Sequence, residues 1–177
     1  MLHRTMLSMA LAGALALGPS ALAAGPPRDG DAIAKMLQSD SPQDVATALR
    51  VLAGTPTVGL EDALVRAARR AEPELSSAAL DLLAQTGDPR AVDLLEAAIR
   101  SADPSRVSVG CVWLPRYGTL GLEAAERLLE DPDPLVRRAV ARTLKWFPPS
   151  PELQGVIERA VAQSRAKRAA RLATAPR

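Results

Sequence analysis

The stretches EDPDPLVRRAVARTL, residues 130–144, and TGDPRAVDLLEAAIRS, residues 86–101, decide the fold class of this chain. In each, an acidic residue stands before a proline. Proline lacks the N–H group that a first helical residue does not need, and the acid accepts from the free N–H groups that follow. Apolar residues then recur at three- and four-residue spacing, which places them on one face of a helix. Both stretches therefore predict amphipathic helices that begin near their prolines.

The same helix start recurs along the chain. Four prolines are separated by steps of 31, 31 and 30 residues: Pro42, Pro73, Pro104 and Pro134. The tenth residue after each is a leucine: Leu52, Leu83, Leu114 and Leu144. The seventh residue after each is small or apolar: Leu49, Leu80, Cys111 and Ala141. The fifth residue before each of these prolines is apolar: Leu37, Ala68, Ile99 and Leu129. The ninth before each is also apolar: Ile33, Leu64, Leu95 and Ala125.

These columns predict two helices in every repeat. The expected first helices span 31–39, 60–70, 89–101 and 120–130, and the expected second helices span 42–53, 73–86, 104–114 and 134–147. A fifth first-type helix is expected from Pro151. Neighbouring pairs bury each other's apolar faces in such a stack. We therefore predict an all-α protein, an α-solenoid of about four and a half helix pairs.

The repeats resemble a known family. The run Asp133-Pro134, Val136, Arg137-Arg138, Ala139 and Leu144 is similar to HEAT-like repeats, in particular the short bacterial type named after phycobilisome lyase subunits. The resemblance covers about residues 31–162, and the segment VSVGCVWLPRYG, residues 107–118, departs from it. It implies that the second helices line the concave side of the solenoid.

The ends of the chain have a different character from the repeats. Residues 1–23 combine a basic start, an apolar run and the small residues Ala21 and Ala23, which is the pattern of a cleavable signal peptide. We expect cleavage after Ala23 and a periplasmic or secreted protein. Residues 24–30 are rich in proline and glycine and are predicted to be a linker, and residues 163–177 a basic C-terminal tail.

The composition argues against several classes of function. The one histidine, His3, lies in the predicted signal peptide, so the mature protein would have no imidazole base, nucleophile partner or metal ligand. We expect no enzyme, no catalytic residues, no metal and no cofactor. With 22 Lys and Arg against 20 Asp and Glu, the chain gives no general case for nucleic-acid binding. Apart from export, no membrane association is expected.

Candidate binding residues gather in the last two complete repeats. A basic and aromatic end of the second-helix surface is predicted from Arg116, Arg138, Arg142, Lys145 and Trp146. The departing segment adds Trp113 and Tyr117. Arginine and tryptophan are enriched at interface hot spots. Two simpler interpretations remain open: the arginines pair with acids such as Glu130 or Asp131, and the two aromatic residues fill a gap between repeats three and four.

These patterns predict an exported solenoid that binds another protein, one that presents an acidic patch, as a scaffold, adaptor or assembly factor. Two alternatives remain. The family name suggests an accessory subunit of a lyase-like enzyme. The basic tail suggests a binder of anionic polymer or lipid.

Overall fold

A computed structural model describes residues 29–53 and 59–174 of the chain. The predicted signal peptide and nearly all of the predicted linker lie outside these residues. The first helices of the pairs are α1 (Gly30–Leu37), α3 (Glu61–Ala68), α5 (Ala91–Arg100), α7 (Gly118–Leu129) and α9 (Pro151–Thr174). The second helices are α2 (Pro42–Leu52), α4 (Pro73–Thr86), α6 (Pro104–Trp113) and α8 (Pro134–Thr143). Short 3₁₀ helices extend α6 and α8: η1 (Leu114–Tyr117) and η2 (Leu144–Trp146).

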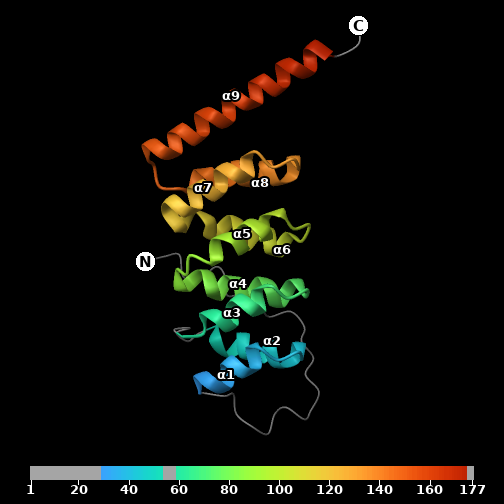
Figure 1. The fold of residues 1–177 in the computed structure, drawn as a ribbon, viewed down its shortest axis with the longest axis vertical. Coiled ribbons are helices and arrows are strands. Elements are labelled where there is room, and N and C mark those ends of the chain that lie inside the picture. The colour runs from blue at the N-terminus through green and yellow to red at the C-terminus, as the bar shows by residue number, and fades with distance from the viewer. Residues whose placement is uncertain (1–28, 54–58, 175–177) are drawn as a thin grey trace.

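The helix pairs are stacked one upon another along the long axis of the molecule (Figure 1). First helices pack on first helices, as α5 does on α7, and second helices on second helices, as α4 does on α2 and α6. No strand occurs among the described residues. The predicted all-α solenoid is therefore confirmed.

The prolines begin the second helices, as the sequence predicts. Pro42, Pro73, Pro104 and Pro134 are all first helical residues. The side chains of Ser41, Asp103 and Asp133 accept hydrogen bonds from N–H groups of the first turn. Glu72 does not cap α4; its carboxylate instead pairs with Arg70 at 2.9 Å. The repeat therefore keeps its proline even where the cap is lost.

Two of the predicted apolar columns form the core without exception. The leucines ten residues after each proline are all buried: Leu52, Leu83, Leu114 and Leu144. So are the residues nine before: Ile33, Leu64, Leu95 and Ala125. Along these columns each second helix packs on the first helix of its own repeat and on the second helix of an adjacent repeat.

The column seven residues after each proline is only partly buried, which corrects the prediction. Leu49 and Leu80 are buried, Cys111 is half-buried, and Ala141 is exposed. In α2 and α4 this position is covered because another second helix follows in the stack. After α8 no further second helix follows within the described residues, so Ala141 faces outward. Leu129, in the column five before each proline, is likewise only half-buried.

Several helix ends also differ from their predicted positions. The fourth second helix, expected to reach residue 147, is α-helical only to Thr143 and then tightens into η2 before Pro148 and Pro149. The first helix begins at Gly30, inside the predicted linker, because Asp29 accepts from the N–H of Asp31. At the other end, α9 runs from Pro151 to Thr174, so the described residues of the predicted basic tail are helical.

Candidate functional site

The seven candidate residues lie in two groups at successive levels of the stack. Trp113, Arg116 and Tyr117 stand at the junction of α6 and η1. The others are on α8 and η2: Arg138, Arg142, Lys145 and Trp146. The structure thus brings the candidates to neighbouring second helices, but their side chains have different surroundings.

Trp113 and Tyr117 face back toward α4 of the preceding repeat. The indole Nε1 of Trp113 donates to Asp81 Oδ1 at 2.6 Å. The hydroxyl of Tyr117 donates to the carbonyl oxygen of Ala84 at 3.2 Å, and burial, aided by the negative charge of Asp88, raises the pKa of this phenol to about 12. The hydrogen bonds of the two aromatic residues therefore join repeat three to repeat two. Tyr117 also lies against α7 of repeat four, where a Cβ atom at Gly121 would be 3.3 Å from the Cβ of Tyr117.

Arg116 lies over the outer side of this junction. Its guanidinium carbon is 4.2 Å from the centroid of the Trp113 ring, and its side chain is exposed. Such a cation–π contact contributes about 0.5–1 kcal/mol at an exposed site. It holds the cation at the surface without neutralising it, because none of the described acids forms an ion pair with Arg116.

Asp131 and Glu130, the acids that the simpler interpretation pairs with these arginines, contact other residues. Asp131 accepts from Arg100 Nε at 2.8 Å, and Glu130 accepts from Gln163 at 2.8 Å. The Arg100 guanidinium also lowers the pKa of the Asp131 carboxyl from its usual value. Within the described part of the chain, Arg138, Arg142 and Lys145 form no ion pair. All three are exposed, so α8 and η2 together present uncompensated positive charge.

Apolar side chains are exposed beside these cations. Leu135 is 68% exposed and Trp146 is 69% exposed, while Val112 on α6 is 38% exposed. Residues 1 and 8 after a repeat proline lie on one side of a second helix, opposite the buried residues 6 and 10. Residue 12, in the 3₁₀ helix that follows α6 or α8, is exposed as well. We call this surface in the last two complete repeats the α6–α8 face; it consists of Val112, Arg116, Leu135, Arg142 and Trp146.

The remaining two cations occupy an adjoining side of α8. Arg138 and Lys145 stand 4 and 11 residues after Pro134, with Ala141 between them in the position 7 residues after it. We call these three residues the end face of α8. The predicted basic and aromatic end is therefore divided between two surfaces. Lys145 links them, because its Nζ lies 4.8 Å from the centroid of the Trp146 ring.

The architecture and the sequence agree on the family. Residues 12–112, more than half of the chain, match the family described as HEAT repeats. The chain belongs to the HEAT repeat family. The match begins within the predicted signal peptide and ends inside α6, yet α7 and α8 continue the same HEAT geometry beyond it. No curated protein matches the chain. HEAT repeats are generally protein-interaction scaffolds.

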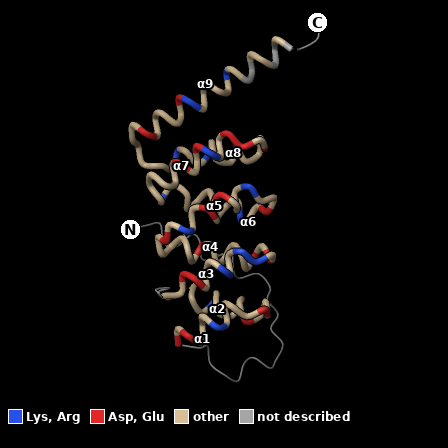
Figure 2. The backbone as a smooth tube through the Cα atoms, in the orientation of Figure 1, with Lys and Arg blue, Asp and Glu red and all other residues tan. Residues whose placement is uncertain are grey.

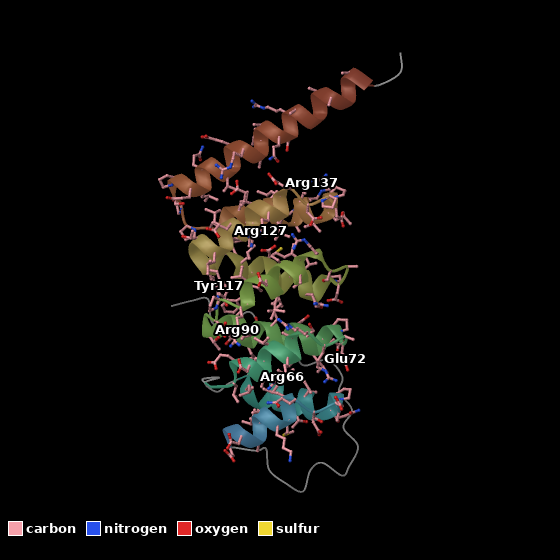
Figure 3. All side chains as sticks on the ribbon, viewed as in Figure 1. Arg66, Glu72, Arg90, Tyr117, Arg127 and Arg137 are labelled. Carbon is pink, nitrogen blue, oxygen red and sulfur yellow. The ribbon has the colours of Figure 1, made fainter. Side chains whose placement is uncertain are left out.

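Ion pairs that the sequence analysis missed join the HEAT repeats along their first helices. Glu96 on α5, only 6% exposed, accepts from Arg127 on α7 and from Arg100 at 3.1 Å. Arg90 pairs with Asp62 at 2.5 Å, and Arg159 with Glu126 at 2.6 Å. Arg90 and Arg127 appear at successive levels of the stack (Figure 3). The sequence could have indicated these ion pairs through their spacing, since the partners in different repeats stand 28–33 residues apart, close to the length of one repeat.

Acidic and basic residues are interspersed along the HEAT stack (Figure 2). The described residues include no group of three or more Cys, His, Asp or Glu placed to hold a metal ion. None of the described helices is long and apolar enough to cross a membrane. The features that stand out chemically are therefore the α6–α8 face and the end face of α8.

Proposed function

We propose that this HEAT-repeat protein is an exported scaffold, adaptor or assembly factor that binds another protein through its α6–α8 face. One observation carries the proposal: Leu135 and Trp146, seven residues before and four residues after Arg142, are largely exposed, and Arg142 forms no ion pair within the described residues. Large apolar side chains beside arginine are typical of interface hot spots. The partner would present apolar side chains flanked by carboxylates, which arginine binds through charge-assisted hydrogen bonds.

The proposal includes export and no catalytic activity of the protein's own. The signal-peptide pattern of residues 1–23 supports export to the periplasm or the medium. An intact mass of the exported protein that begins at Ala24 would agree with cleavage after Ala23, whereas retention of residues 1–23 would contradict it. Turnover by the isolated protein would instead favour the lyase-like enzyme function. Salt-sensitive retention on anionic polymer, lost on deletion of residues 163–177, would favour the polymer or lipid function.

Affinity capture with the tagged protein from the exported fraction of the source cells tests the binding surface. The double variant Leu135→Ala with Trp146→Ala should lower the captured partner by about tenfold or more, because removal of a hot-spot residue costs ~2 kcal/mol. Both side chains are exposed, so the melting temperature should hardly change.

The chain offers a matched control for that experiment. Leu120 is 48% exposed and Val161 is 44% exposed, and both lie outside the α6–α8 face. The double variant Leu120→Ala with Val161→Ala removes two exposed apolar side chains elsewhere on the stack and should leave capture unchanged. Equal capture by the two double variants would contradict the proposed surface.

A further inference from the structure

The last repeat that the structure describes is incomplete. In the four complete repeats a first helix is followed by a second helix, but α9 is a first helix without a described successor. Leu153 and Val156 of α9 are buried, and Arg159 and Gln163 contact Glu126 and Glu130 of α7. Helix α9 therefore occupies the place of a fifth first helix, above α7.

The place of a fifth second helix, above α8, is empty in the described structure. Figure 1 shows α9 leaving the stack obliquely, so that its C-terminal half stands away from α8. Burial agrees with the picture. The residue 7 after the proline is buried or half-buried in each second helix that another second helix covers: Leu49, Leu80 and Cys111. The equivalent residue of α8, Ala141, is exposed, as are Arg138 and Lys145 on either side of it in the end face.

We infer that the end face of α8 binds one amphipathic helix of another protein, acidic along one edge, in the place of a fifth second helix that the described residues leave open. Since α9 already fills the place of the first helix, the space accepts a single helix but not a further helix pair, which excludes a second copy stacked end to end. Ala141 allows a close approach of backbones. Arg138 and Lys145 flank it without carboxylate partners among the described residues, so the docked helix needs carboxylates at its edge.

This inference rests on the proposed protein-binding function but assigns a different surface to it. The α6–α8 face lies along the side of the stack, whereas the end face of α8 closes its last repeat. A partner that bound both would place one helix on the end of the stack and further residues along its side. The two surfaces are separable by substitution, because Leu135 belongs only to the first and Ala141 only to the second.

The chain supplies a probe of the required chemistry. Residues 73–86, PELSSAALDLLAQT, form the second helix α4 and carry Glu74 and Asp81 but no base. In the stack α4 packs directly on another second helix, α2. A synthetic peptide of this sequence, blocked at both ends and labelled with fluorescein, should bind the purified protein in a fluorescence anisotropy titration. A peptide of the same composition in scrambled order should not bind, since charge alone does not provide an apolar face.

Variants of the end face decide the site. Arg138→Glu with Lys145→Glu should weaken binding of the peptide about tenfold or more, since two attractive contacts become repulsive. Ala141→Gln adds bulk at the centre of the face without changing charge, and should also weaken binding. The control Lys35→Glu with Arg50→Glu makes the same change of charge on exposed residues at the other end of the stack and should leave the affinity within about twofold.

Three results would overturn the inference: no binding of the peptide, equal binding of the scrambled peptide, or unchanged binding by Ala141→Gln. Leu135→Ala separates this result from the proposed function, because it should lower partner capture through the α6–α8 face and leave the peptide affinity unchanged. Peptide binding without any captured partner would overturn the proposed function alone. Capture that depends on Leu135 without peptide binding would overturn the inference alone.

Discussion

At the scale of single residues, the scarce aromatic side chains connect repeats. Trp113 and Tyr117 both reach back to α4, one to a carboxylate and the other to a backbone carbonyl. The segment around them breaks the repeat pattern because Pro115 ends α6 and a 3₁₀ helix carries the chain to Tyr117. The segment that departs from the family pattern thus connects two repeats. Its residues Val112 and Arg116 are the ones that belong to the α6–α8 face.

Tyr117 is the only tyrosine in the chain, so its ionisation can be followed directly. The tyrosinate absorbance should rise with a midpoint at about pH 12, compared with about 10 for a free phenol. Because burial raises the pKa in the folded state, the neutral phenol stabilises the fold fully below about pH 10 and loses that effect as the pH rises toward 12. The change should vanish in Tyr117→Phe. A titration midpoint near pH 10 in the folded protein would show that the Tyr117 ring is solvated.

At the scale of helices, α6 lies very close to α5 at Gly110. A Cβ atom at this position would lie 2.9 Å from the carbonyl oxygen of Leu95 and 2.5 Å from Cγ1 of Ile99. The equivalent residues of the other second helices are buried but larger: Ala48, Ala79 and Val140. Glycine is therefore required here by the approach of the two helices, although it weakens α6 on its own.

Two glycine substitutions should have opposite effects. Gly110→Ala should lower the free energy of unfolding by about 1–3 kcal/mol, because backbone and a buried side chain must shift. In α9, a Cβ at Gly155 meets only the end of the Arg159 side chain, at 3.2 Å. Gly155→Ala should therefore raise the free energy of unfolding by about 0.5–1 kcal/mol through helix propensity. Denaturant titration measures both changes. Stabilisation by Gly110→Ala would mean that α5 and α6 are further apart than described.

At the scale of the whole molecule, stability is shared between adjacent repeats. Each repeat contacts its neighbours through buried apolar residues and through pairs such as Glu96 with Arg127. Such stacks are stabilised by nearest-neighbour interfaces and are weakest at their ends. The C-terminal end shows this gradient within one helix. The first turns of α9 bury Leu153 and Val156, whereas its described side chains from Ser164 onward are exposed.

Two truncations should separate these parts of α9. Deletion of residues 164–177 should change the free energy of unfolding by no more than about 0.5 kcal/mol, as for surface changes. Deletion of residues 151–177 should lower it by about 3 kcal/mol or more, because two buried side chains are lost together with the Arg159–Glu126 pair. Thermal and denaturant unfolding of both forms test the contrast. Equal losses in the two truncations would show that the projecting half of α9 also packs.

Much of the fold was predictable because its signals are local. A proline with a cap residue begins a helix wherever it occurs, and apolar residues spaced like Leu80 and Leu83 mark one face of that helix. The candidate site was predictable only in part. Counting from Pro134 was enough to place Arg142 and Trp146 on an outward side. The exposure of Leu135 could not be predicted in this way, because the sequence around a leucine in the first turn does not show whether another helix covers it.

The sequence by itself therefore determined the helix pairs, their period and their core columns, since these depend on residues within a few turns of one another. Only the tertiary structure decided the rest. Ala141 is exposed while Leu80, in the same column, is buried, because burial depends on whether another second helix follows in the stack. The direction of Trp113 toward Asp81 likewise depends on which neighbouring helices are present.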